Sequence, residues 1–404
     1  MRIWNDEKVK NAVLIGTLCS VLYLCVYFAR NILGAVTPQI LEEGQFSTEY
    51  IGSLSSWFFA FYAVGQLVNG IIGDRVKARN MLSAGLLLSG VCSLLMPTLL
   101  PWQLPTSAVY GMTGYFLAMI YAPMTKTVAE NTEPLYATRC SLGYTLASFL
   151  GSPLAGVTAA VFAWQTAFYI SGAALVAMAI TCFAGFLWFE KRGIVTYGRY
   201  TRKEKQSGSI RVLLERQIVK FTLVSIVTGV IRTSVVFWIP TYVSQYLGFS
   251  PKASASIYTV STLAISSAAF IAAFLYERLR RNMNLTLLVA FGASALSFLL
   301  VYLVPQPVCN IAGLVLTITM ANCASTMLWS WYCPSLRDTG MVSSATGFLD
   351  FVSYMAAAVS STLFAGASTT IGWKNLILIW FILMAFGTAI CVRDGLRKKE
   401  GEMV

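Results

Sequence analysis

The 404-residue chain contains no histidine, and only 11% of its residues are charged. Histidine is the most frequent general base and metal ligand at neutral pH, so its absence removes most catalytic and metal-binding arrangements. The nine cysteines include no Cys-x-x-Cys pair, and no glycine-rich phosphate-binding loop follows a strand. We therefore predict neither an enzyme nor a bound cofactor or metal.

Apolar residues dominate the composition, at 57% with a mean hydropathy of +0.68. This exceeds what a soluble core can bury and predicts an integral membrane protein. Hydrophobicity that alternates with a period of two is missing, which excludes an outer-membrane barrel. The expected fold is all-α, with twelve membrane-spanning helices near 12–41, 50–73, 80–98, 104–126, 136–163, 165–189, 217–247, 251–276, 284–304, 307–332, 341–367 and 373–392.

The net charge of +12 comes from alternate loops and the C-terminal tail. Most lysines and arginines outside the apolar runs lie in 75–79, 191–216, 278–281 and 393–399, whereas the intervening loops hold Lys252 and Lys374. By the positive-inside rule this pattern places both termini in the cytoplasm. We therefore attribute the basic charge to the orientation of the chain in a bacterial inner membrane, and we predict no nucleic-acid partner.

The two halves of the chain repeat one another. Arg30 and Arg232 lie 202 positions apart in apolar segments, and a proline follows each arginine by eight residues. Phe46 and Phe249 continue the correspondence at an offset of 203. A register kept over this distance indicates an internal duplication. We predict two pseudo-symmetric six-helix bundles, residues 1–189 and 217–404, joined by a basic cytoplasmic linker at 190–216.

The matched arginines are the strongest functional signal. Each lies about 12 residues, or roughly 18 Å at 1.5 Å per residue, inside the outer end of its helix. An arginine near the bilayer centre costs about 2.5–3.5 kcal/mol on the insertion scale. Asp350 is the one clear carboxylate at similar depth and can pair with one of them or act as a protonatable coupling group. We predict that Arg30 and Arg232 bind an anionic substrate.

A family resemblance follows from these motifs. Gly70-x-x-Gly73-Asp74-Arg75 after the second helix, with twelve helices and a basic central linker, resembles the major facilitator superfamily. The segment Arg232-x5-Trp238-x-Pro240-Thr-Tyr242 is similar to the seventh-helix signature of the organophosphate:phosphate antiporters. Those proteins include the glycerol-3-phosphate and hexose-phosphate transporters. The resemblance covers nearly the whole chain.

The resemblance also implies further binding residues. Tyr23 and Tyr27 match first-helix tyrosines of the antiporters, and Tyr62 matches a second-helix tyrosine that lines their cavity. Gln66 replaces a lysine found in glycerol-3-phosphate transporters. Lys126 matches a basic residue near the inner end of the fourth helix, although a positive-inside anchor also explains it. We expect these side chains to contact the substrate with the two arginines.

Charged residues after the second helix of each half suggest a conformational latch. Asp74, Arg75 and Arg79 occupy this place in the first half, and Glu277 and Arg278 in the second. We predict that they hold neighbouring helices together on the cytoplasmic side. A solvated topology signal is the alternative explanation.

The resulting functional prediction is a monomeric secondary transporter that uses rocking-bundle alternating access. It exchanges a small organic anion, a phosphorylated metabolite, for inorganic phosphate across the lipid bilayer. One alternative is a proton-coupled symporter of a carboxylate or sugar acid that uses Asp350. A second alternative is a transporter-like membrane sensor of a phosphorylated sugar.

Overall fold

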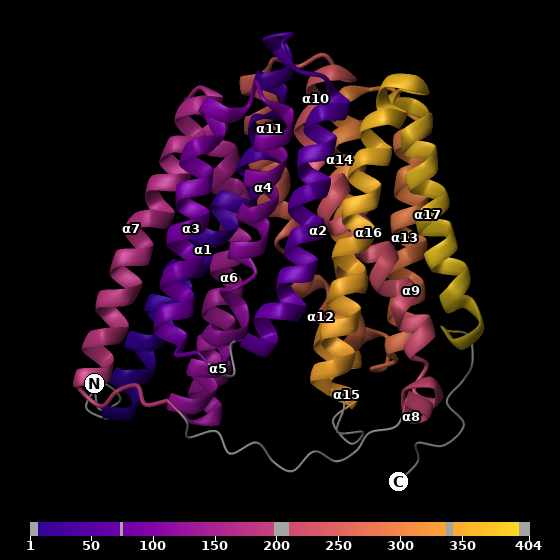
Figure 1. Cartoon of the computed structure of the whole chain (residues 1–404). Helices are drawn as coiled ribbons and strands as arrows, with labels where there is room; N and C mark the ends of the chain where they lie inside the picture. The colour runs from indigo at the N-terminus through magenta and orange to yellow at the C-terminus, as the bar shows by residue number, and fades with distance from the viewer. Residues whose placement is uncertain (1–6, 73–75, 198–209, 337–341, 396–404) are drawn as a thin grey trace. The chain divides into compact units, whose positions relative to one another are not determined.

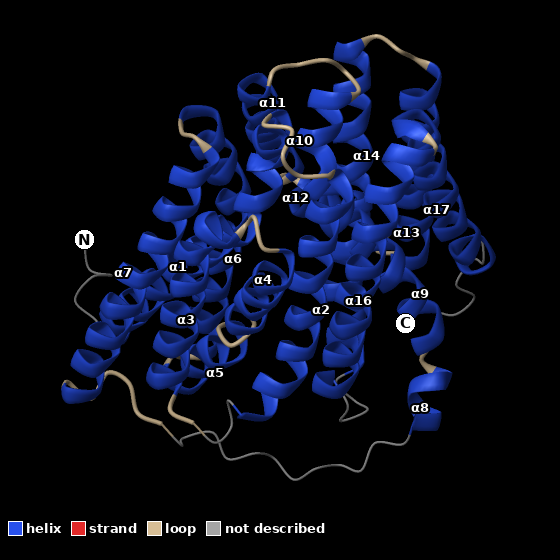
Figure 2. Cartoon of the chain, turned by 45° about the horizontal axis from the view of Figure 1, so that its top comes forward, coloured by secondary structure: helices blue, strands red, loops and turns tan. Residues whose placement is uncertain are grey.

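The computed structural model describes residues 7–72, 76–197, 210–336 and 342–395. Figures 1 and 2 show these residues as helices joined by short loops, without a strand in the described part. The helices of the first half are α1 (Glu7–Glu42), α2 (Thr48–Ile72), α3 (Ala78–Leu99), α4 (Gln103–Leu117), α5 (Tyr121–Asn131), α6 (Pro134–Val161) and α7 (Trp164–Lys191).

The helices of the second half are more often interrupted. Two of its apolar runs contain a short π-helical turn, in which hydrogen bonds reach five residues along the chain. The elements are α8 (Ile210–Glu215), α9 (Ile218–Gly229), the π-turn η2 (Val230–Val235), α10 (Val236–Gln245), α11 (Pro251–Ile265), α12 (Ala268–Arg278), α13 (Met283–Leu303), α14 (Pro307–Met327), the π-turn η3 (Leu328–Tyr332), α15 (Cys333–Ser335), α16 (Val342–Thr370) and α17 (Gly372–Gly395).

The predicted all-α membrane fold is confirmed. Among the described residues, eleven helical segments are long and apolar enough to cross a membrane. The remaining predicted run, 104–126, is divided into α4 and α5 at residues 118–120. Pro123 has no N–H to donate to the carbonyl of Met119, which favours an interruption at this place.

Contacts divide the chain into two compact units. Unit 1 contains Met1–Glu204 and Ile239–Leu263, and unit 2 contains Lys205–Trp238 and Ala264–Val404. The contacts thus group residues 239–263 with the first half of the chain. The division into bundles at 1–189 and 217–404 stays a prediction from the sequence.

Helices of unit 1 pack in pairs across small residues. α1 packs along α6, α2 along α4, and α3 along α7. A Cβ at Gly151 of α6 would meet Tyr27 and the backbone of Phe28 on α1, and a Cβ at Gly114 of α4 would meet the carbonyl oxygen of Phe58 on α2. Glycine therefore permits both helix pairs to approach closely, as is common in membrane bundles.

This packing predicts a cost for adding one methyl group to α4. Gly114→Ala should lower the free energy of unfolding by about 1–3 kcal/mol, because the backbone of α2 must shift to admit the methyl group. The measurement is the melting temperature of the purified protein in detergent. Gly366→Ala is the matched control, since nothing lies within 4 Å of a Cβ at Gly366. Equal melting temperatures for the two variants would contradict the prediction.

Candidate functional site

Arg30 lies among aromatic rings in unit 1. Its guanidinium carbon is 5.3 Å from the ring centroid of Tyr27, 5.8 Å from that of Phe59 and 4.8 Å from that of Tyr62. Tyr27 is on the same helix as Arg30, whereas Phe59 and Tyr62 come from α2. Ring faces attract a cation by about 2 kcal/mol or more when water is excluded. These three ring contacts thus stabilise the positive charge of Arg30.

A cluster of tyrosines continues from Arg30 toward the N-terminal end of α1. The ring of Tyr27 is 5.0 Å from that of Tyr23, and Tyr23 lies 5.8 Å from Tyr121 of α5 and 5.9 Å from Tyr144 of α6. Of the predicted residues, Tyr27 and Tyr62 therefore lie beside Arg30, and Tyr23 lies beside Tyr27. Tyr121 and Tyr144 were not predicted, because they belong to other helices and no spacing in the sequence connects them with α1.

The other two predicted residues of unit 1 lie farther along its helices. Gln66 is half-buried on α2, one turn beyond Tyr62. Lys126 is half-buried on α5, five residues after Tyr121. Their part in substrate binding stays a prediction.

Arg232 lies on the π-turn η2 of unit 2. Its guanidinium carbon is 5.8 Å from the ring centroid of Tyr354 on α16. Asp350 precedes Tyr354 by four residues, so the two share one face of α16. Arg232 and Asp350 are both half-buried. The continuous helix expected around Arg232 is thus a π-turn, a feature that is frequent at functional sites.

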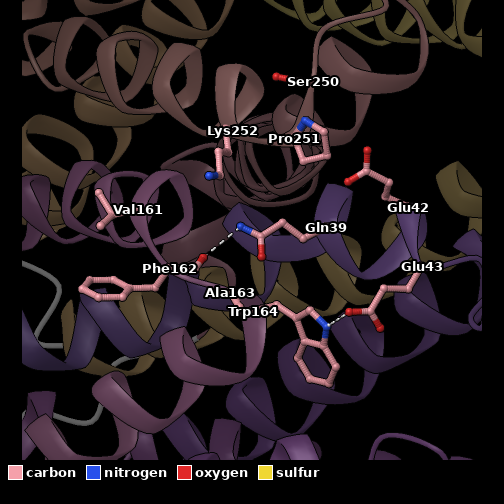
Figure 3. A pocket seen from close by; sticks show the side chains of 10 residues that line it. All are labelled: Gln39, Glu42, Glu43, Val161, Phe162, Ala163, Trp164, Ser250, Pro251 and Lys252. Atoms are coloured by element: carbon pink, nitrogen blue, oxygen red, sulfur yellow. Dashed lines mark hydrogen bonds between the residues drawn. The ribbon is translucent and has the colours of Figure 1, made fainter.

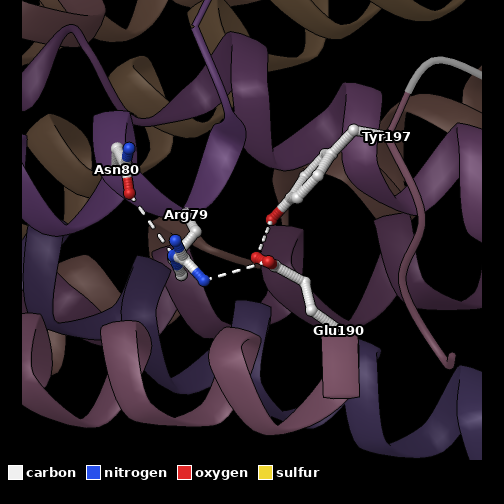
Figure 4. Close-up of polar contacts among 4 residues, drawn as sticks. All are labelled: Arg79, Asn80, Glu190 and Tyr197. Atoms are coloured by element: carbon white, nitrogen blue, oxygen red, sulfur yellow. Dashed lines mark hydrogen bonds and ion pairs between the residues drawn. The ribbon is translucent and has the colours of Figure 1, made fainter. Parts of the chain in front are cut away.

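The predicted latch is described only in part. Asp74 and Arg75 lie outside the described residues, and Glu277 and Arg278 are exposed at the end of α12. Figure 4 shows the contacts of Arg79. Its Nη1 lies 2.9 Å from Oε2 of Glu190 on α7, and the Tyr197 hydroxyl donates to Oε1 of Glu190 at 3.1 Å.

These contacts join α3 to α7 and to the segment that follows α7. The Arg79 and Glu190 side chains are 14% and 20% exposed, so water screens their ion pair only weakly. Burial, and then the negative charge of Glu190, raise the pKa of Tyr197 above its usual value, so its hydroxyl keeps the proton that it donates. The role of the pair in conformational change stays a prediction.

A second polar region of unit 1 lies at the C-terminal end of α1. A hollow of about 500 Å³ lies there, and Figure 3 shows the side chains that line it. Gln39 donates to the carbonyl of Phe162 at 3.1 Å, and Nε1 of Trp164 donates to Oε1 of Glu43 at 2.7 Å. Sequence reasoning missed this hollow because three separate segments form it. Its lining residues are Gln39, Glu42, Glu43, Val161, Phe162, Ala163, Trp164, Ser250, Pro251 and Lys252.

Comparison with known proteins identifies the family. Residues 19–360 match the Major Facilitator Superfamily. The chain belongs to this superfamily. The chain is similar in structure, with a TM-score of 0.80 and 12% sequence identity, to a bacterial homologue of the human lysosomal transporter Spinster; the match covers 95% of this chain and 97% of that one. Its superfamily comprises multi-pass membrane transporters and not enzymes.

Several relatives of the chain are named for phosphorylated compounds, and one is named as a sensor. The chain is 37% identical over 73 residues to the membrane sensor protein UhpC of Escherichia coli, which is 18% of this chain and 17% of UhpC. It is 21% identical over 399 residues to the phosphoglycerate transporter protein of Salmonella typhimurium, covering 92% of this chain and 85% of that protein. The chain thus spans about a sixth of UhpC. The predicted relation to the organophosphate:phosphate antiporters is confirmed.

The ion pair in Figure 4 makes a testable contribution to the stability of the transporter. Glu190→Gln should lower the free energy of unfolding by about 1–3 kcal/mol, because it leaves the largely buried Arg79 without its counter-charge. Glu133→Gln is the control, since it breaks the Lys8–Glu133 pair, whose side chains are 68% and 52% exposed. Melting temperatures in detergent should fall for the first variant only. An equal fall in both would contradict the prediction.

Proposed function

We propose that the protein is a secondary transporter that exchanges a phosphorylated metabolite for inorganic phosphate. The observation that carries this proposal is the placement of Arg30 and Arg232, each half-buried in an apolar helix of its own unit and each beside tyrosine rings. Relatives named as phosphoglycerate and glycerol-3-phosphate transporters support a phosphorylated substrate.

The chemistry of the guanidinium group suits this substrate. A phosphate monoester carries about −1.5 to −2 charges and three strong acceptor oxygens at neutral pH. Arginine presents its donors in a planar fork that matches two phosphate oxygens at once. A tyrosine ring attracts a cation through its π-electrons and carries no net negative charge. The contacts of Tyr27 and Tyr62 with Arg30 are therefore compatible with attraction between this arginine and an anion.

Electrostatics favours exchange over one-way transport. An arginine that is withdrawn from water when a carrier changes conformation loses hydration energy. A bound anion offsets this loss, whether it is phosphate or the phosphorylated metabolite. The loaded protein can then change conformation, while the empty protein is held back. In this proposal Arg30 and Arg232 both contact the anion, Tyr23, Tyr27, Tyr62, Gln66 and Lys126 line its path, and the termini face the cytoplasm.

Substitution of the arginines tests the binding site. Arg30→Lys and Arg232→Lys should each lower phosphate exchange by about ten- to a hundredfold, because lysine keeps the charge but loses the two-pronged contact worth about 1.5–3 kcal/mol per bond. The measurement is uptake of labelled phosphate into proteoliposomes that contain unlabelled phosphate. Arg192→Lys, an exposed position after α7, is the control. Ordinary exchange in both arginine variants would defeat the proposed site.

Counterflow tests the exchange mechanism. External phosphate should accelerate the efflux of labelled phosphate from proteoliposomes several-fold, because only the loaded carrier changes conformation readily. Equal efflux with and without external phosphate would contradict obligatory exchange.

A proton-coupled symporter of a carboxylate or sugar acid is the second candidate. The observation that favours it is Asp350, which shares a face of α16 with Tyr354, the tyrosine that Arg232 contacts. In the same vesicles, a symporter would accumulate substrate when a pH gradient is imposed, and Asp350→Asn would abolish that accumulation. Phosphate exchange that is retained in Asp350→Asn favours the antiporter.

A membrane sensor is the third candidate, and the similarity to UhpC over 73 residues favours it. Binding of a sugar phosphate without measurable flux would support the sensor over both transporters.

A further inference from the structure

The π-turn that carries Arg232 corrects a mismatch in register between two helices of unit 2. α9 and η2 pack along α16 through three contacts at small residues. In order, these contacts are a hydrogen bond from Ser225 Oγ to the carbonyl of Leu349 at 2.7 Å, the close approach of Gly229 to Ser353, and a hydrogen bond from Ser234 Oγ to the carbonyl of Ala357 at 2.7 Å.

The spacing of these contacts differs on the two helices. On α16 each contact residue follows the previous one by four residues. On the partner helix the first interval is four residues, and the second, from Gly229 to Ser234, is five. In a regular α-helix each residue turns by about 100°, so the fifth residue would leave the shared face. The π-turn absorbs the extra residue. Its hydrogen bond runs from the N–H of Val236 to the carbonyl of Ile231, five residues back.

Arg232 lies inside this turn, between Gly229 and Ser234. Tyr354, whose ring lies 5.8 Å from the Arg232 guanidinium, directly follows Ser353 on α16. If the turn relaxed to a regular helix, the side chains on one side of it would rotate by about 100° relative to α16. The direction of the Arg232 side chain therefore depends on the extra residue staying in the turn.

Ser234 fastens this turn to α16. Its side chain is fully buried, and its hydroxyl lies 2.7 Å from Oγ of Ser360 and accepts from Oγ of Ser361 at 3.2 Å, in addition to its bond to Ala357. A buried hydroxyl that leaves such a network forfeits its hydrogen bonds. The network thus opposes any movement of the turn along α16.

We propose that Ser234 is a positioning residue for anion binding, which acts through Arg232 by holding the π-turn in register with α16. This inference rests on the proposed function, because it assigns to Ser234 a part in the arginine's contact with the anion.

The experiment compares two serines that make the same kind of bond. Ser234→Ala removes the hydrogen bond from the π-turn to α16. Ser225→Ala removes an equally short hydrogen bond to α16 from a part of α9 that is regular. The dissociation constant for inorganic phosphate is measured with purified protein, alone and in combination with Arg232→Lys. Melting temperatures of all variants report the structural cost of each substitution. Ser360→Ala removes the hydroxyl that contacts Ser234 from the side of α16 and replaces Ser234→Ala if that variant does not fold.

We expect Ser234→Ala to raise the phosphate dissociation constant about tenfold and Ser225→Ala less than twofold, at similar melting temperatures. In the Arg232→Lys background, Ser234→Ala should have little further effect, because residues that act through one another are not additive. Equal weakening by both serine variants, or a full tenfold effect that persists with Arg232→Lys, would overturn the inference and leave the proposed function standing. Unchanged phosphate affinity in Arg232→Lys would instead defeat the proposed role of Arg232, and this inference with it.

Discussion

The cost of keeping a guanidinium group in an apolar helix is the constraint on which the rest of the structure depends. The charge cannot be neutralised by proton loss, because arginine stays protonated at any physiological pH. It must therefore be stabilised by its surroundings. Around Arg30 this is done by the rings of Tyr27, Phe59 and Tyr62. Such contacts lower the energy of the cation while preserving its attraction for an anion.

The surroundings of the two arginines also depend on how closely their helices approach neighbouring helices. Gly151 brings α6 against the backbone of Tyr27 and Phe28, and Gly229 brings α9 against Ser353. In unit 1 the glycine belongs to the partner helix, and in unit 2 it belongs to the helix of the arginine. On α16 the residue after Ser353 is Tyr354, so the close approach at Gly229 also brings the ring of Tyr354 near Arg232.

The repeat in the sequence does not produce the same local structure twice. α1 is a regular helix through Arg30, whereas the matching segment forms a π-turn at Arg232. Arg30 contacts three rings from two helices, and Arg232 contacts Tyr354 on the face of α16 that also carries Asp350. The two matched segments therefore hold one residue type in different surroundings.

The sequence by itself determined the class of protein and most of the apolar helices, and it identified the two arginines. Each depends on local composition or on spacing along the chain, because insertion into a bilayer requires about twenty apolar residues in succession. Only the tertiary structure decided that Tyr121 and Tyr144 join Tyr23, that Arg79 pairs with Glu190, and that η2 is a π-turn. The π-turn reflects a difference in contact spacing between two helices that lie more than a hundred residues apart in the sequence. The sequence of either helix alone does not show how the two helices pair.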